Sequence, residues 1–284
     1  GDIAIAKDVE TPLYNFAGVI DDHEMQITHV IRGEDHINNT PKQILFMEAL
    51  GFSRPHYAHL SLILDPDRSK MSKRYSATAI KEYREQGYLP AAVVNFMGLL
   101  GWHSKEVKEI FPLAELVTEF DLSRAQKAGA VFNIEKLNWI NAQYIKKLSE
   151  EELAEKLNLP ASEQNIKIVR LSKERMNKLS DFPNIANFFY QLPDYPPDLL
   201  IWKNQSKTHT INVLEELIAI IGDNPAPGGI MALADKKGRG EVLWPLRAAL
   251  SGLDASPGPL EILDVLGKEE AMRRVDAAIK KLKF

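Results

Sequence analysis

Hydrophobic positions in the first 65 residues follow the pattern of an α/β unit. The run "ITHVIRG" (Ile27–Gly33) is rich in β-branched residues and ends in glycine, which is typical of a short buried strand. The segment "NNTPKQILFMEALGF" predicts a helix, because Thr40 can cap it, Pro41 suits its first position and Gly51 can end it. "HYAHLSLILD" (His56–Asp65) predicts a second strand. This order predicts a parallel crossover, whose ligands bind beyond the carboxyl ends of the strands.

From Ala79 onward the apolar positions recur at helical spacing, with breaks at glycine and proline. The expected helical segments are 79–103, split at Gly87 and Pro90, then 123–157, 166–190 with a break near Pro183, 211–221, 243–250, and a last helix in which Met272, Val275, Ile279 and Leu282 share one face. The fold class is therefore predicted to be mainly α, with a partial α/β segment at the amino terminus.

Composition narrows the function classes only a little. The 284 residues carry a net charge of −4 and are 45% hydrophobic, which is ordinary for a globular protein and leaves room for a local basic face. The absence of cysteine excludes disulfides and thiolate metal sites. No apolar run approaches the ~18 residues of a membrane span. The opening "GDIAIAKDVE" lacks the apolar region of a signal peptide, so a cytoplasmic location is expected.

A dense group of cations lies in "LDPDRSKMSKRYS". Arg68, Lys70, Lys73 and Arg74 fall within seven positions, directly after the second predicted strand. Clustered cations and hydroxyls suit a polyphosphate, whose negative charge must be neutralised during transfer. The alternative is a solvated, charged turn without a ligand.

A second candidate site lies at the end of the first predicted strand. Arg32 offers a planar fork for a carboxylate, and Tyr14 offers a hydroxyl on a rigid ring. From the residues alone, a surface ion pair is the better explanation of Arg32, and a position in the core is the better explanation of Tyr14.

Four separated blocks resemble bacterial glutamyl-tRNA synthetases. "KMSKR" matches the second signature of class I aminoacyl-tRNA synthetases, and the blocks are "TPLYNFAGVIDDHEMQITHVIRGEDHINNTPKQILFMEALGF", "YREQGYLPAAVVNFMGLLGW", "VFNIEKLNWINAQYI" and "PLRAALSGLDASPGPLEILDVLGKEEAMRRV". The resemblance implies the second half of a Rossmann-type catalytic domain over residues 1–64. It implies the KMSKR loop and a helical stem-contact domain over 65–149, and an all-helical anticodon-binding region over 150–284, with a division near residue 205 left open.

The resemblance also implies substrates and the residues that hold them. ATP would be bound with Mg²⁺, and no zinc site is expected. Tyr14 and Arg32 would hold L-glutamate, although Gly18 stands where some family members place an asparagine that also contacts this substrate. Catalysis would use three cations of the loop, and the adenosine and phosphates of ATP would meet a wider set. The catalytic set is Lys70, Lys73 and Arg74, and the ATP set is Lys73, Glu34, His36, Met71 and Ser72.

The implied macromolecular partner is tRNA-Glu, with tRNA-Gln left open. Cations with nearby glycine suit phosphate contacts. The candidates are Arg124, Lys127, Lys236, Lys237, Arg239 and Arg247. Trp202, Trp244 and Arg247 would serve to stack anticodon bases, but tryptophans on helices are more often core residues. Intact family members are usually monomeric.

Other assignments fit less well. Glutaminyl-tRNA synthetase has β-barrels where this chain is helical, and the paralogue that modifies queuosine lacks an anticodon domain. None of the seven histidines forms the His-x-Gly-His signature that the family carries near its amino terminus. The chain therefore resembles the carboxy-terminal part of a longer enzyme. A non-catalytic tRNA-binding module, or a remnant, remains the alternative function.

The first prediction concerns activity. We expect the 284-residue chain alone to give negligible glutamylation of tRNA-Glu, because Tyr14, Arg32 and the cationic loop would form only half of a pocket. Aminoacylation with labelled glutamate measures this directly. Turnover near that of an intact synthetase would contradict it.

Overall fold

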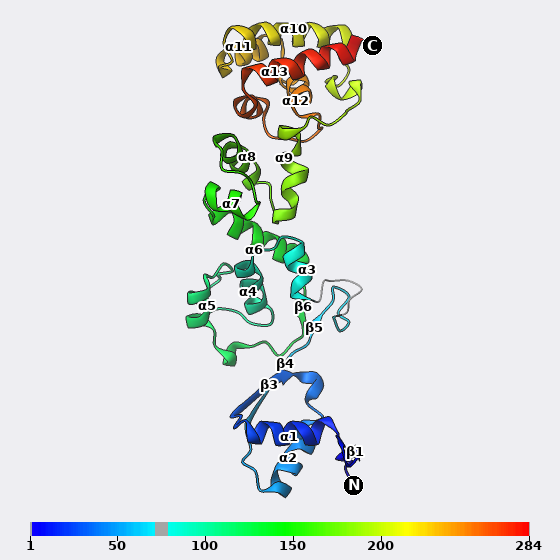
Figure 1. Ribbon diagram of the computed structural model, residues 1–284, viewed down its shortest axis with the longest axis vertical. Coiled ribbons are helices and arrows are strands. Elements are labelled where there is room, and N and C mark those ends of the chain that lie inside the picture. Colours follow the sequence, from blue (N-terminus) through cyan, green and yellow to red (C-terminus); the bar gives the residue numbers. More distant parts are fainter. Residues whose placement is uncertain (1, 72–78, 284) are drawn as a thin grey trace. The chain divides into compact units, whose positions relative to one another are not determined.

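The computed structural model describes residues 2–71 and 79–283. The chain forms two compact units. The first unit comprises Gly1–Glu85 with Pro90–Ile140, and the second comprises Gln86–Leu89 with Asn141–Phe284. Helices dominate both units, and the sheets formed by the described residues have two strands each, which confirms the mainly α prediction (Figure 1). None of the described helices is both long and apolar enough to span a bilayer.

The first unit contains the predicted crossover. Strands β3 (His29–Gly33) and β4 (His56–Leu60) pair in parallel, and helix α2 (Thr40–Leu50) connects them. Two predicted signals of α2 are confirmed, the proline in the first turn and Gly51, which closes the helix at a left-handed φ of 70°. The predicted cap is wrong, because Thr40 is the first helical residue and Asn39 precedes it without a side-chain cap hydrogen bond. Helix α1 (Tyr14–Glu24) packs against α2. The strand–helix–strand prediction is confirmed.

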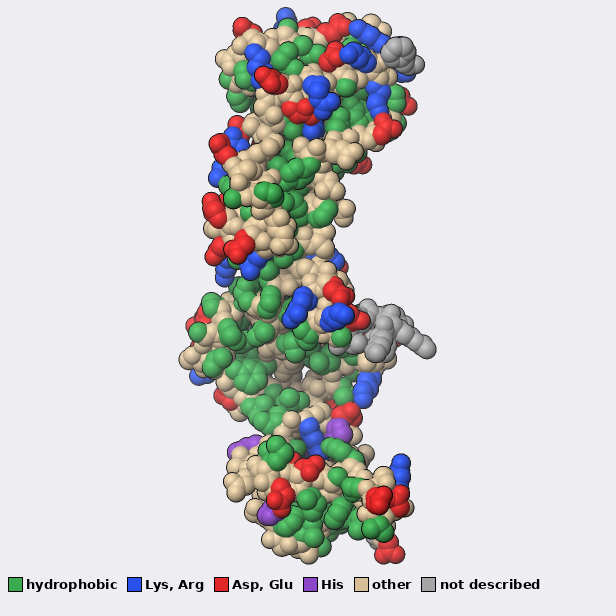
Figure 2. All heavy atoms as spheres, in the orientation of Figure 1, with side chains coloured by type: hydrophobic (Ala, Val, Ile, Leu, Met, Phe, Trp, Pro, Cys, Tyr) green, Lys and Arg blue, Asp and Glu red, His purple; other side chains and the backbone are tan. Residues whose placement is uncertain are grey.

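The parallel pair is only partly covered. Within the described ranges β3 pairs with β4 alone. Ile27 and Ile31 keep 36% and 51% of their surface exposed, and hydrophobic side chains show on this part of the first unit (Figure 2). Parallel sheets are normally covered on both faces, and two strands alone are marginally stable. The described residues therefore leave apolar surface of this sheet in solvent.

The remaining elements of the first unit are short. They are β1 (Ala6–Asp8), β2 (Thr11–Pro12), the 3₁₀ turn η1 (Glu34–His36), β5 (Ile63–Leu64), α3 (Ile80–Glu85), α4 (Pro90–Leu99), α5 (Leu113–Glu119), the 3₁₀ turn η2 (Leu122–Arg124), β6 (Ala130–Val131) and the first half of α6 (Ile134–Lys147). The predicted helix pair of 79–103 is confirmed as α3 and α4. Gly87 separates them with a φ of 81°.

One predicted helix is wrong in its first third. Residues 123–133 were expected to be helical, but they form the end of η2 and the strand β6, which pairs in parallel with β5. Gly129 shows why. It directly precedes β6, and a Cβ at this position would lie 2.5 Å from Cδ1 of Leu64, so the close approach of β5 favours glycine here. This pairing joins residues far apart in the sequence, and local composition does not reveal it.

A buried asparagine organises the helical part of the first unit. Asn95 of α4 is fully buried, and its amide Nδ2 donates to the carbonyl of Glu109 at 3.0 Å. Its Oδ1 accepts from the backbone N–H of Phe111 at 2.8 Å. The side chain thus pairs backbone groups of a loop that has no hydrogen-bonded strand beside it among the described residues. Trp102, Phe111 and Leu116 pack together beside it as an apolar cluster.

The second unit is built from helices joined by short turns. After the second half of α6, its elements are α7 (Glu150–Lys156), α8 (Glu163–Lys173), the 3₁₀ turn η3 (Leu179–Asp181), α9 (Phe182–Tyr190), the 3₁₀ turn η4 (Pro197–Leu200), α10 (Lys207–Asp223), α11 (Pro227–Lys237), α12 (Arg239–Ser251) and α13 (Pro259–Lys283), which is kinked at Gly267. Ser149, Ser162 and Ser206 cap α7, α8 and α10 through their hydroxyls.

A buried arginine joins three of these helices. Arg274 of α13 is 2% exposed, and its Nη1 donates to the carbonyls of Phe188 at 2.8 Å and Leu250 at 2.6 Å. Nη2 donates to the carbonyl of Phe189, and Nε donates to Oε1 of Glu270 at 2.7 Å. The three carbonyls lie in the last turns of α9 and α12, where helices leave acceptors unpaired and carry negative partial charge.

Glu270 completes this arrangement. Hydrogen bonds from Arg273, and then from Arg274, lower the pKa of Glu270 to about 2, against the opposing effect of burial. The carboxylate is therefore charged at neutral pH, and the buried guanidinium has a full counterion.

We expect the Arg274→Met variant to lose about 3–5 kcal/mol of unfolding free energy. The substitution leaves the carbonyls of α9 and α12 buried without their donor, and removing one partner of a buried pair has costs of this order. Urea unfolding followed by tryptophan fluorescence measures it, because Trp202 and Trp244 lie in the same unit.

Arg273→Met is the matched control, since Arg273 is exposed and bonds the same Glu270. It should lose less than about 1 kcal/mol. The folded-state pKa of Glu270 is lowered, so its contribution is present above pH 4.5 and fades as the pH falls towards 2. Equal losses in the two variants would contradict this account.

Candidate functional site

Arg32 lies at the carboxyl end of β3, and its side chain is fixed against α2. Nη2 donates to Oγ1 of Thr40 at 2.7 Å and to Oε1 of Gln43 at 2.8 Å. Cζ lies 5.4 Å from the ring centroid of Tyr57. Nε is buried and has no hydrogen-bond partner within the described ranges. The guanidinium is thus held in one orientation with donors left over.

A second layer holds the partners of Arg32. Gln43 is 2% exposed, and its Nε2 donates to Oδ1 of Asn15 at 3.4 Å. The Thr40 hydroxyl lies 2.9 Å from Nε2 of His59 on β4. Elements α1, α2 and β4 therefore all contribute to placing one guanidinium.

The other predicted substrate contacts gather near the same strand end. Tyr14, the first residue of α1, is 55% exposed, and its ring centroid lies 5.5 Å from that of His36 in η1. Oε1 of Glu34 accepts the backbone N–H of Leu62 at 3.2 Å. Because η1 follows β3 directly, the structure brings Tyr14, Arg32, Glu34 and His36 to one edge of the sheet.

The cationic segment reaches this edge through Lys70. Its Nζ lies 3.0 Å from Oδ2 of Asp35, in the middle of η1. The backbone N–H of Met71 donates to the carbonyl of Ile63 at 3.1 Å, so the segment is also tied to β5. Ser72, Lys73 and Arg74 lie outside the described residues. Of the predicted loop residues, Lys70 and Met71 are placed.

Met71 faces an apolar space. It lines a cavity of about 130 Å³ together with residues of β5, α3 and α4. The other lining residues are Ile63, Ile80, Tyr83, Val93, Phe96, Met97, Leu100, Phe132 and Leu137. These apolar contacts can hold the cationic segment at Met71 against β5, α3 and α4.

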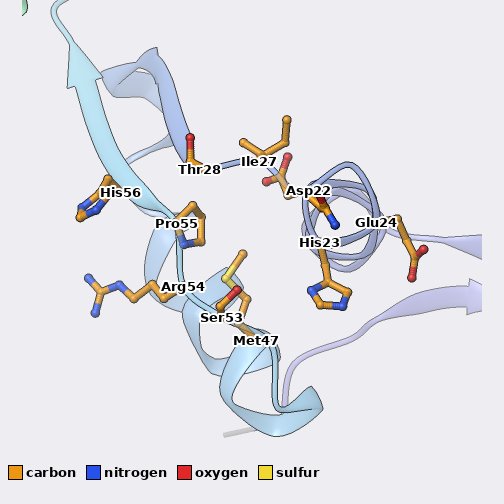
Figure 3. A pocket seen from close by; sticks show the side chains of 11 residues that line it. Asp22, His23, Glu24, Ile27, Thr28, Met47, Ser53, Arg54, Pro55 and His56 are labelled. Atoms are coloured by element: carbon orange, nitrogen blue, oxygen red, sulfur yellow. The ribbon is translucent and has the colours of Figure 1, made fainter.

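A larger cleft of about 610 Å³ lies at the opposite ends of the strands (Figure 3). It is lined by the end of α1, the residues that precede β3 and those that precede β4. Its polar side chains are those of Asp22, His23, Glu24, Gln26, Thr28, Ser53, Arg54 and His56. Burial raises the pKa of Asp22, and the charge of Arg32 opposes this effect. Those predicted ATP and glutamate contacts that the structure describes, Tyr14, Arg32, Glu34, His36 and Met71, do not line this cleft.

Two predicted phosphate contacts lie in the first unit and differ in exposure. The side chain of Arg124 is 17% exposed, its Cζ lies 5.1 Å from the Trp102 ring centroid, and it donates to the carbonyl of Glu119. Lys127 is exposed and has no ion pair within the described ranges. Lys127 is therefore the freer of the two cations.

Three more candidates lie where α11 gives way to α12. Nζ of Lys237 pairs with Glu216 at 2.6 Å, and Nε of Arg239 pairs with Asp235 at 3.3 Å. Lys236 is exposed. Basic and acidic side chains are interspersed over α10–α13 on the face that Figure 2 shows, so this face has no continuous basic patch.

Arg247 belongs to a stack of rings and cations. Its Cζ lies 4.5 Å from the ring centroid of Trp244, which lies 5.1 Å from that of Trp202. Nζ of Lys203 lies 4.9 Å from the Trp202 ring. The Trp244 indole donates to the carbonyl of Leu199 at 2.8 Å, so the stack is anchored to η4. Both tryptophans are partly buried, so each has part of its surface in the core and part in solvent.

Sequence reasoning missed Asp35, Thr40 and Gln43 as parts of the site. Asp35 stands inside the quoted "RGEDH", between two residues that were selected. Gln43 falls four residues before the buried Met47, on the inward face of α2. A polar residue at a core position of a helix is the signal by which the sequence could have identified Gln43. The described residues contain no cluster of three or more His, Asp or Glu side chains suited to a metal.

Comparison with known families matches nearly the whole chain. A family model described as "tRNA synthetases class I (E and Q), catalytic domain" matches residues 1–139. A second, described as "Anticodon binding domain", matches residues 112–279.

Individual relatives agree with these matches. A protein named glutamate–tRNA ligase from Carboxydothermus hydrogenoformans is 41% identical over 97% of this chain, and one from Natranaerobius thermophilus is 38% identical over 99%. A crystal structure of a glutamate tRNA ligase from Elizabethkingia meningosepticum, in complex with its amino acid, superposes with a TM-score of 0.85 at 35% identity over 98% of this chain. In each case the chain spans 62% of the relative's length.

The contact between Lys70 and Asp35 can be tested by titration. The hydrogen bond from Lys70 holds the pKa of Asp35 below its ordinary value of 3.8. In a Lys70→Gln variant the pKa of Asp35 should rise towards that value, because the carboxylate loses its cation. Carboxyl ¹³C chemical shifts measured against pH report it.

Asp67 is the internal control. Its pKa is lowered by hydrogen bonds from Ser69, which the variant leaves in place. An unchanged pKa of Asp35 would show that Lys70 does not rest on η1 in solution.

Proposed function

This chain belongs to the class I tRNA synthetases for glutamate and glutamine (E and Q), and we propose that it acts in joining glutamate to tRNA-Glu. The reaction would be ATP-dependent activation of L-glutamate, followed by transfer to the 3′ end of the tRNA. The observation that carries the proposal is the Lys70–Asp35 contact. It unites Lys70, the first residue of the "KMSKR" signature, with the 3₁₀ turn that follows the strand end holding Arg32.

Arg32 supports the glutamate part of the proposal. A guanidinium fixed by Thr40 and Gln43 presents donors in a set direction, which suits a carboxylate. Tyr14 is exposed at the start of α1 and can add a hydroxyl hydrogen bond. Glutamate bears two carboxylates and one ammonium, so these two residues account for only part of the required contacts.

ATP would lie along η1 and the cationic segment. His36 and Glu34 lie where the adenosine part is proposed to bind, and Lys70 offers an exposed ammonium to the phosphates. Met71, Ser72, Lys73 and Arg74 complete the proposed contacts, with Lys73 and Arg74 stabilising the departing pyrophosphate. Mg²⁺ would accompany the ATP, held mainly by phosphates and water, and would neutralise phosphate charge.

The helical regions would bind the tRNA. The domain ranges of this proposal are a Rossmann-type segment at 1–64, the loop and stem-contact domain at 65–149, and an anticodon-binding region at 150–284. Lys127 and Lys236 are the most accessible phosphate contacts, and Arg124, Lys237 and Arg239 would have to exchange existing partners.

Base recognition is proposed for the stack around Arg247. Splayed RNA bases bind to aromatic and guanidinium planes, and this stack offers both. The second candidate function is a tRNA-binding module without catalysis in a cytoplasmic setting. It is favoured by the match of the family model described as "Anticodon binding domain", which covers residues 112–279.

The test is binding of this chain to tRNA-Glu, to the same tRNA with exchanged central anticodon bases, and to tRNA-Gln, over a salt series. We expect the anticodon exchange to weaken binding by about 1–3 kcal/mol, the scale of losing one stacked base. Each phosphate contact should add to the salt dependence, so Lys127→Gln should lower the salt slope by about 0.7 to 1.

Arg247→Gln provides the matched contrast. It should remove the preference for the native anticodon, whereas Lys127→Gln should weaken every tRNA alike. Binding that ignores the anticodon and disappears with salt would contradict base recognition by the second unit.

A further inference from the structure

We propose that Gln43 determines the charge selectivity of the Arg32 site, by holding the guanidinium with a neutral oxygen so that its positive charge stays available to a carboxylate ligand. The inference rests on the proposed function, in which Arg32 binds an amino acid that bears carboxylates. Gln43 is a positioning residue in this account, because it acts on the ligand through Arg32.

The hydrogen bonds of Arg32 use neutral acceptors. Both run from Nη2, to the hydroxyl of Thr40 at 2.7 Å and to the amide oxygen of Gln43 at 2.8 Å. These acceptors take the two hydrogens of Nη2. A guanidinium has five N–H groups, so the group is fixed through one nitrogen and keeps three donors for other partners.

The orientation of the Gln43 amide is determined by its neighbours. Arg32 can only donate, so the atom that faces it at 2.8 Å must be the oxygen Oε1. Nε2 then faces Oδ1 of Asn15, which accepts from it at 3.4 Å. The amide therefore bridges α1 and β3 from a position on α2 that is 2% exposed.

No carboxylate compensates this charge within the described ranges. Arg32 forms no ion pair there, whereas Lys70, Lys237 and Arg274 each lie within 3.0 Å of a carboxylate oxygen. Asp22 lies close enough to feel the charge, but the two groups are not in contact as an ion pair. The buried Nε also lacks a partner in this part of the chain. An arginine that is rigidly held and left without a counterion is suited to receive an anion.

The choice of an amide at position 43 matters because glutamate has the same shape with a charge. A carboxylate there would lie 2.8 Å from Nη2 in a site with almost no solvent. Such a pair would be strong and would largely cancel the positive potential that a ligand meets. The neutral residue thus leaves Arg32 to distinguish a ligand carboxylate from an uncharged amide.

The experiment compares L-glutamate with L-glutamine as ligands for the ¹⁵N-labelled chain, by NMR titration at constant ionic strength. Wild type should bind glutamate more tightly than glutamine. Gln43→Glu should weaken glutamate binding at least tenfold and abolish the preference, with spectra that otherwise stay close to wild type. Gln43→Met should lose affinity several-fold through poorer placement of Arg32 but keep the preference, because it adds no charge.

Gln164→Glu is the control for net charge, since it adds the same group at an exposed position of α8. It should bind glutamate as wild type does. If Gln43→Glu does not fold, the Gln43→Met variant carries the test, and unchanged glutamate affinity in it would overturn the inference.

Two further results would also overturn it. They are a wild-type chain without preference for glutamate, and a folded Gln43→Glu variant that binds glutamate within twofold of wild type. Either can occur while the chain still binds tRNA-Glu through its anticodon. The tRNA titration therefore shows separately whether the proposed function fails.

Discussion

The second unit depends on one buried guanidinium. Arg274 belongs to α13 and donates hydrogen bonds to carbonyls in the last turns of α9 and α12. A single side chain thus pairs the ends of two helices and links both to a third. Helix ends inside a core otherwise leave acceptors unpaired. Glu270 supplies the counterion from the same helix one turn earlier, which keeps the charge balanced without a contribution from elsewhere. The apolar packing of α10–α13 can then proceed around a neutral, hydrogen-bonded centre.

In the first unit a second arginine is also held by hydrogen bonds, but it has no counterion within the described ranges. Arg32 is also held by neighbouring helices, but its acceptors are a hydroxyl and an amide, and no carboxylate pairs with it within the described ranges. Arg274 is compensated and closed off, whereas Arg32 is fixed and left charged. The two arginines differ in what surrounds them, and this difference separates an architectural cation from one suited to a ligand.

The sequence predicted those features that local patterns determine. β3, α2 and β4 follow from a β-branched run, Pro41 and Gly51. Tyr14, Arg32, Glu34 and His36 follow from the family resemblance, and their common location at one end of the sheet required the structure. The strand β6 was missed, because "SRAQKAGAV" favours a helix locally. The strand forms through its pairing with β5, in which Leu64 lies opposite Val131, and this partner is distant in the sequence. Thr40 was expected to cap α2, but it lies inside the first turn and its hydroxyl serves Arg32. The role of Gln43 was hidden for the same reason, since it depends on side chains from three elements.

The spacing of contacts along the chain has a consequence for the order in which the two arginines find their partners. Arg32 meets Thr40 and Gln43 across 8 and 11 residues, whereas Arg274 meets Phe188 across 86. Closing the longer loop costs about 2 kcal/mol more chain entropy than closing the shorter. Local contacts of the first kind form readily in a chain that is still largely unfolded. The hydrogen bonds that hold Arg32 are thus encoded within residues 32–43, whereas those of Arg274 form only when α9, α12 and α13 come together.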